Sequence, residues 1–147
     1  MDPNNPVVKL CVQGMEEESK GNDERAAELF EQAWKQSSDD FERCIAAHYV
    51  ARHQADAELA LRWNQEAMNC VQRVTDARVT EFFPSLYLNL GKSHEDLGNL
   101  EEARRNYECA AEKLSCILAG PYRDIIQDGI ERGLQRTAFR YPNSKAD

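Results

Sequence analysis

The residues best placed to do chemistry in this chain are a cysteine and a histidine one helical turn apart. Cys44 and His48 stand at positions i and i+4, a spacing that can direct two ligands at one metal ion. A structural zinc site needs four ligands, however, and no second pair of this kind follows in the sequence. We therefore expect both residues to pack in the core, and we predict no metal and no cofactor.

Catalytic arrangements are also missing from the pattern. The adjacent carboxylates of Glu95 and Asp96 would point about 100° apart on a helix, so they do not form an acid–base pair. His53 and His94 fit structural roles better than the role of a base. The sequence has no glycine-rich phosphate loop, nucleophile elbow or kinase signature. We predict no catalytic residues and no enzyme activity.

Charge and cysteine usage restrict the setting and the partners. The chain of 147 residues carries a net charge of -8, which argues against nucleic acid as a partner. The run Glu16–Glu18 would attract a basic partner segment, although a solvated acidic face is the simpler explanation. Five cysteines without a CxxC motif indicate reduced thiols. With neither a signal peptide pattern at its start nor an 18-residue apolar run, the chain is expected to be cytoplasmic, with no membrane partner.

The helices that position these residues can be predicted from one helical stretch that is interrupted by a turn. Residues 87–114 keep helical apolar spacing on both sides of Gly98 and Asn99. Glycine ends helices readily because it enters the left-handed backbone region without a Cβ penalty. Asn99 can cap the next helix, with Glu102 three residues later completing a capping box. This stretch therefore predicts two helices joined by a tight turn.

The same pattern recurs along the chain. The interval from Ala26 to Ala60 is 34 residues, as is the interval from Ala33 to Ala67. From Ala60 to Ala103 the interval is 43 residues, so nine residues are inserted, and we expect a lengthened second helix and a loop within 69–84. A period of 34 built from helix-turn-helix units is typical of one repeat class.

The chain resembles the tetratricopeptide repeat family at this point, and the resemblance covers roughly residues 7–117. The third unit matches best, through Tyr87, Leu90, Gly91, Gly98, Ala103, Tyr107 and Ala110. The first unit supplies Leu10, Gly14, Gly21, Ala26, Phe30 and Ala33. The second unit departs from the motif, with His48 in place of a small residue, Ala55 in place of the turn glycine and Asn64 in place of an aromatic.

The resemblance implies an all-α fold, a right-handed α-solenoid of helix-turn-helix repeats with a C-terminal capping helix. We expect a single domain over 1–140, with repeats at about 7–40, 41–74 and 84–117 and the capping helix at about 121–139. Stacked repeats need a terminal helix that covers the last apolar face. The tail at 141–147 is expected to be disordered.

The function implied by the resemblance is a non-enzymatic interaction module or adaptor that binds a peptide or helix of a partner protein. The first helix of each repeat would line a concave groove for a basic or amphipathic segment. The predicted groove residues are Val8, Cys11, Met15, Ile45, Tyr49, Arg52, Leu88, Asn89 and Lys92. Interhelical core is an equal alternative for Val8, Met15, Ile45 and Leu88. The alternative function is a homodimer that buries the groove or the terminal helix.

Overall fold

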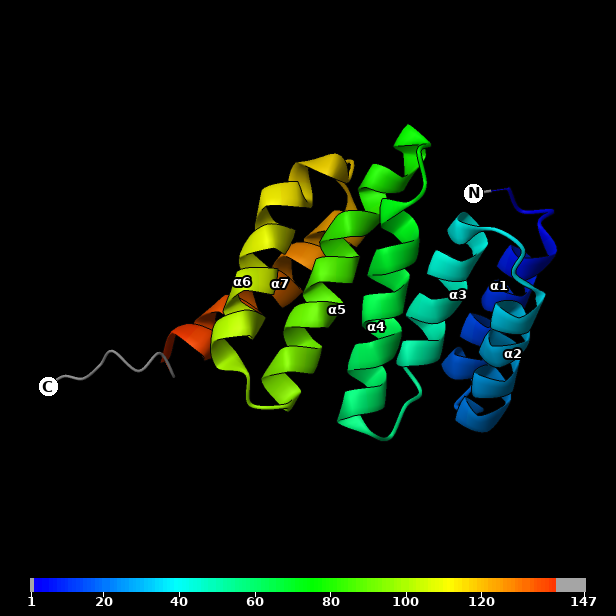
Figure 1. The fold of residues 1–147 in the computed structure, drawn as a ribbon, viewed down its shortest axis with the longest axis horizontal. Helices are drawn as coiled ribbons and strands as arrows, with labels where there is room; N and C mark the ends of the chain where they lie inside the picture. The colour runs from blue at the N-terminus through cyan, green and yellow to red at the C-terminus, as the bar shows by residue number, and fades with distance from the viewer. Residues whose placement is uncertain (1, 140–147) are drawn as a thin grey trace, which may run out of the picture. The chain divides into compact units, whose positions relative to one another are not determined.

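The structure, a computed structural model, describes residues 2–139 and is built over that range from helices joined by short turns (Figure 1). The α-helices are α1 (Pro6–Ser19), α2 (Asp23–Gln36), α3 (Asp40–Ala51), α4 (Ala57–Gln72), α5 (Phe83–Asp96), α6 (Leu100–Lys113) and α7 (Pro121–Phe139). Two 3-10 helices, η1 (Ala77–Phe82) and η2 (Leu114–Cys116), lie before α5 and after α6. No strand occurs within the described range, so the predicted all-α class is confirmed. The tail predicted at 141–147 lies outside the described residues.

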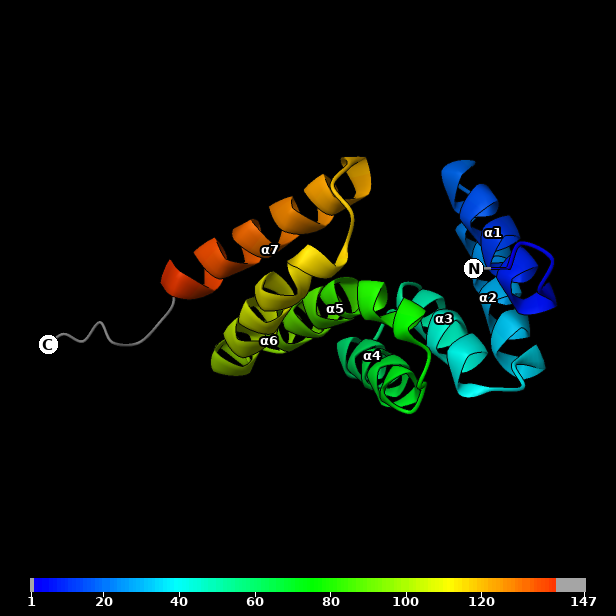
Figure 2. The same cartoon turned by 90° about the horizontal axis from the view of Figure 1, so that it is seen from above.

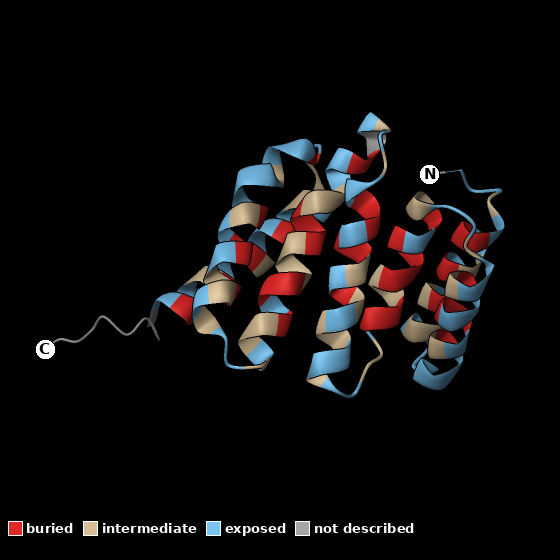
Figure 3. Cartoon of the chain, in the orientation of Figure 1, coloured by how far each residue is buried: buried red, intermediate tan, exposed pale blue. Residues whose placement is uncertain are grey.

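The helices pack in consecutive pairs, as the repeat spacing predicts. α1 packs with α2, α3 with α4 and α5 with α6, while α7 follows without a second helix among the described residues. The chain divides into two compact units, unit 1 (Met1–Asp76) with the first two pairs and unit 2 (Ala77–Asp147) with the third pair and α7. Within each unit the buried residues lie on the faces that the helices turn toward one another (Figure 3). The single domain over 1–140 remains a prediction.

The turn between α5 and α6 confirms one part of the predicted break and corrects another. Gly98 has a φ of 81°, in the left-handed region that favours glycine, and it ends α5 as expected. The side chain of Asn99 makes no capping hydrogen bond, so the predicted capping box is wrong. The backbone of Asn99 has a ψ of 70°, away from the extended conformation that capping residues adopt. Its N–H donates to the carbonyl of His94 at 2.9 Å instead.

The insertion after the second pair has little effect on helix length. α4 has 16 residues, against 14 in both α2 and α6, so it is longer by two residues only. Most of the remaining insertion forms η1, which leads directly into α5. Pro84 stands in the first turn of α5, where its missing N–H would have no partner within the helix.

A buried aromatic ring against a glycine sets the helix spacing in the first pair. A Cβ on Gly14 would lie only 2.3 Å from Cε1 of Phe30, so the absence of a side chain lets α1 approach the ring. Phe30 is fully buried and packs with Ala26 and Val50. The small residues predicted for close helix contact therefore take that role in unit 1.

The third pair repeats this arrangement and extends it to α7. The fully buried ring of Tyr107 on α6 lies against Gly91 of α5 and Gly133 of α7. A Cβ would come within 2.6 Å of the ring at Gly91 and within 2.5 Å at Gly133. Ile126 and Ile130 of α7 are buried in the same unit. α7 lies along α6 and packs on both α5 and α6 (Figure 2), so it covers their apolar surface as the predicted capping helix should.

In the second helix pair, α3 and α4, the large and the small residue of the glycine–aromatic contact have changed places. Gly14 and Phe30 are 16 residues apart, as are Gly91 and Tyr107, and the same spacing in the second pair joins His48 to Asn64. A ring therefore occupies the glycine position and a small side chain occupies the aromatic position. Asn64 is buried, and burial lowers the pKa of His48. We infer that the two departures from the motif compensate each other in volume.

Candidate functional site

The predicted groove residues of unit 1 divide into a buried group and an accessible group. Val8, Cys11 and Ile45 are at most 5% exposed and belong to one core cluster, so they hold α1 against α3. Met15 and Tyr49 are partly buried, and Arg52 is exposed. A partner at this face of unit 1 would therefore contact Met15, Tyr49 and Arg52 rather than the buried three.

Tyr49 is the aromatic residue that this face presents. Its ring stacks on Phe30 of α2, with centroids 5.0 Å apart and an interplanar angle of 17°. The guanidinium carbon of Arg52 lies 5.4 Å from the centroid of the same ring, within reach of a cation–π interaction. The contacts of the Tyr49 ring with Phe30 and Arg52 restrict the rotation of its side chain. Little side-chain conformational entropy therefore remains to be lost when a partner binds.

An ion pair that sequence reasoning missed connects α1 to α3 on the same side. Glu18 accepts a hydrogen bond from Nη2 of Arg52 at 3.0 Å, and Nε2 of His53 lies 2.7 Å from its other carboxylate oxygen. Glu18 and Arg52 are 34 residues apart, which is the repeat interval. Opposite charges at the repeat interval were therefore the signal available in the sequence.

The equivalent residue in unit 2, Glu95, forms the same kind of ion pair between two helices. Glu95 follows Gly91 by four residues, as Glu18 follows Gly14, and it accepts from Nε of Arg136 at 2.7 Å. Tyr107 donates its hydroxyl to the same carboxylate at 2.6 Å. Burial disfavours the charged carboxylate, but these hydrogen bonds outweigh it and the pKa of Glu95 is lowered. α7 is thus held to α5 as α3 is held to α1.

The predicted groove residues of unit 2 lie along α5 and are partly or fully accessible. Leu88 is partly buried beneath α7, where a Cβ on Gly129 would lie 3.0 Å from one of its methyl carbons. Asn89 is partly buried, and Lys92 is exposed and paired with Asp96 one turn away. Leu88 therefore has a packing role in unit 2, whereas Asn89 is partly accessible and Lys92 is exposed.

Of the two residues singled out for metal chemistry, Cys44 is buried in unit 1 and His48 is partly buried there. Cys44 is buried, and burial raises the pKa of its thiol to about 12, which keeps it protonated at neutral pH. Burial, together with the charge of Arg52, lowers the pKa of His48 to about 4. Among residues 2–139, no group of three or more potential ligands is placed to hold a metal ion.

The lowered pKa of the partly buried His48 leads to a pH prediction. The folded protein keeps His48 neutral below pH 6.5, while the unfolded chain takes up the proton, so stability should fall as the pH drops. We expect the free energy of unfolding to decrease by about 2 kcal/mol between pH 7 and pH 5. The contribution of His48 is the difference between the pH profiles of the free energy of unfolding of the wild type and of His48→Gln, both measured by urea unfolding. A His48 resonance that titrates near pH 6.5 by NMR would contradict the assignment.

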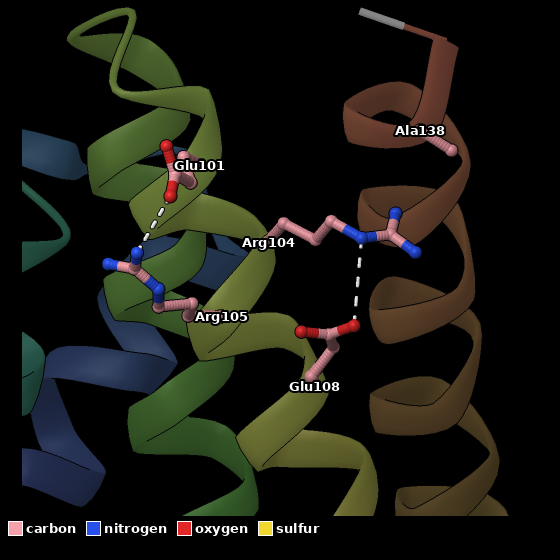
Figure 4. A pocket seen from close by; sticks show the side chains of 5 residues that line it. All are labelled: Glu101, Arg104, Arg105, Glu108 and Ala138. Atoms are coloured by element: carbon pink, nitrogen blue, oxygen red, sulfur yellow. Dashed lines mark hydrogen bonds and ion pairs between the residues drawn. The ribbon is translucent and has the colours of Figure 1, made fainter. Parts of the chain in front are cut away.

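A surface hollow of about 410 Å³ lies between α6 and α7 (Figure 4). Its lining consists of Glu101, Arg104, Arg105, Glu108 and Ala138. Arg104 extends toward α7, where it donates to the carbonyl of Leu134 at 3.4 Å and pairs with Glu108 at 3.6 Å. Small-molecule sites are lined mostly by apolar side chains, and this charged hollow lacks such a lining.

Comparison with known proteins identifies the third helix pair. Residues 84–112, which contain all but one residue of α5 and of α6, match the profile of the tetratricopeptide repeat. The third helix pair is a tetratricopeptide repeat. The comparisons with curated proteins and with solved structures gave no match.

Tetratricopeptide repeats are protein–protein interaction modules and are generally not enzymes, so the matched repeat favours a protein partner for this chain. The two earlier helix pairs have the same spacing and the same small residues, with the departures of the second pair described above. Among the described residues of the chain, no helix is both long and apolar enough to span a membrane.

Proposed function

We propose that this chain is a tetratricopeptide-like, non-enzymatic adaptor that binds a segment of a partner protein on the surfaces of its first helices. In unit 1 the contact residues are Met15, Tyr49 and Arg52. In unit 2 they are Asn89 and Lys92 beside Leu88. A reducing compartment such as the cytoplasm suits the five free thiols.

The observation that supports this proposal most directly is the environment of Tyr49. An aromatic side chain that is partly exposed, backed by Phe30 and flanked by Arg52 has the features of an interface anchor. Met15 packs in the same cluster and supplies apolar surface beside the ring. A basic or amphipathic segment suits this face, because the chain as a whole carries a net charge of -8.

The test of this proposal is the replacement of Tyr49. Once a partner has been identified by affinity capture, Tyr49→Ala should weaken binding by about 1–3 kcal/mol in calorimetry. Leu59→Ala is the matched control, because Leu59 is also an exposed apolar residue of unit 1 but lies on α4. Equal losses in both variants, or a hydrogen-exchange footprint confined to α2, α4 and α6, would show that the first helices do not form the site.

The alternative function is a homodimer that buries the groove or α7. The exposed apolar side chains at the start of α7 are the surface that such a dimer would bury through α7. Sedimentation velocity over micromolar concentrations distinguishes the two functions. A monomer at every concentration favours the adaptor, and a dimer lost in Tyr49→Ala favours self-association through the groove.

A further inference from the structure

Exposed apolar side chains gather where α7 begins. Leu118 is 89% exposed, Tyr122 52% and Ile125 68%, and they fall within eight consecutive residues. Among the described residues, the other large apolar side chains with comparable exposure are Val12 and Leu59, both 42% exposed and both in unit 1. Tyr122 and Ile125 are three residues apart on α7, so their side chains are neighbours on the helix surface. We call Leu118, Tyr122 and Ile125 the α7 patch.

The α7 patch is separate from the surface that attaches α7 to the repeat. Ile126 and Ile130 fill the core of unit 2, and Gly133 receives the ring of Tyr107. Tyr122 and Ile125 occupy other positions of the same helix, Leu118 precedes the helix, and all three are exposed rather than part of that core. The exposure of the α7 patch therefore has no structural purpose within unit 2, and an apolar cluster of this kind marks an interaction site.

The size of the α7 patch argues against a second copy of the chain as its occupant. Three side chains offer on the order of a few hundred Å² of apolar surface. A stable dimer needs about 800 Å² from each partner. A short segment of three or four helical turns, with its apolar side chains on one face, matches the available surface better.

The charge next to the α7 patch selects the polar face of the occupant. Asp124 is exposed beside Ile125, and the guanidinium of Arg123 is directed inward to the carbonyl of Ile117 at 3.4 Å. Asp128 is paired with Arg132, so Asp124 provides the local charge that a partner would meet. The net charge of -8 adds an attractive field for a basic ligand.

We propose that the α7 patch docks a short amphipathic helix of a partner protein, apolar on one face and basic on the other. This site is independent of the proposed groove, because it shares no residue with it.

The proposal is tested with a displayed library of 14-residue amphipathic helices. The polar positions encode Lys and Glu in equal numbers, and the apolar face is fixed. Selection uses the full chain, after depletion on the variant Tyr122→Ser/Ile125→Ser. Both replaced residues are exposed, so we expect this variant to keep the helical circular dichroism and melting temperature of the wild type.

The expected result is enrichment of Lys over Glu and binding that falls at least tenfold in the double variant, while the control Leu59→Ser leaves it unchanged. Asp124→Lys should weaken the same peptides several-fold, with a smaller effect at high salt. Enrichment of Glu, equal recovery on the double variant, or sensitivity to Tyr49→Ala in place of Tyr122 and Ile125 would overturn the proposal. So would a dimer in sedimentation velocity that the double variant abolishes, because a second copy would then be the occupant.

Discussion

Gly133→Ala should lower the free energy of unfolding by about 3 kcal/mol, although alanine is normally the better residue inside a helix. The new Cβ would lie 2.5 Å from the ring of Tyr107. That ring cannot move away easily, because Gly91 lies against it and its hydroxyl is bound to Glu95 at 2.6 Å. The clash should therefore displace α7 or distort the pair α5–α6. Urea unfolding followed by circular dichroism measures the loss.

Gly129→Ala provides the matched control on the same helix. Its Cβ would lie 3.0 Å from a methyl carbon of Leu88, the flexible end of a side chain that can adjust. Alanine should then leave stability unchanged or raise it by up to about 1 kcal/mol through helix propensity. Gly91→Ala should resemble Gly133→Ala, because it meets the same ring at 2.6 Å. Equal stability of the Gly129 and Gly133 variants would mean that Tyr107 is not confined as described.

Asn64→Tyr should destabilise the second pair by about 3 kcal/mol, because it places an aromatic ring at a position where His48 already occupies the glycine site. His48→Gly alone should also cost about 2 kcal/mol or more, since it leaves a cavity and adds a glycine inside α3. Combined, the two changes recreate the glycine and aromatic of the first and third pairs. We expect the double variant to recover most of the stability lost by Asn64→Tyr.

A double-mutant cycle measures this coupling. The free energies of unfolding of the wild type, both single variants and the double variant should give an interaction energy of about 2–3 kcal/mol in favour of the double variant. Trp63→Phe is a suitable control partner for His48→Gly, because it changes an aromatic residue next to Asn64 without altering the 16-residue relation. Additive effects within about 0.5 kcal/mol would show that His48 and Asn64 do not share a packing site.

The helix pairs were predictable from the sequence because their signals are local. Gly98 needs a positive φ, and a positive φ ends a helix wherever it occurs. The 34-residue interval from Ala26 to Ala60 marks positions that need a small side chain, because two helices approach closely there. Ala26 is fully buried, as that role requires. The capping box predicted at Asn99 does not form. In the turn, the N–H of Asn99 donates to the carbonyl of His94, and this backbone hydrogen bond, not a bond from the side chain, sets the ψ angle of Asn99.

The accessible part of the predicted groove was decided by tertiary structure alone. Apolar periodicity shows which side of a helix is apolar, but it does not show whether a neighbouring helix covers that side. Val8 and Ile45 are covered because α1 packs directly on α3, while Tyr49 on the same face stays partly exposed. The α7 patch likewise has the composition of a core segment and is exposed only because nothing among the described residues packs on it.

The sequence by itself thus determined the helix pairs, their small contact residues and the type of repeat, because backbone propensity and close packing act within one pair. Tertiary structure decided the tie of Glu95 to Arg136, 41 residues away, and the confinement of Tyr107 between two glycines. These contacts join helices whose separation in the sequence leaves many partners possible. Only the packed chain brings a particular carboxylate within 2.7 Å of a particular guanidinium.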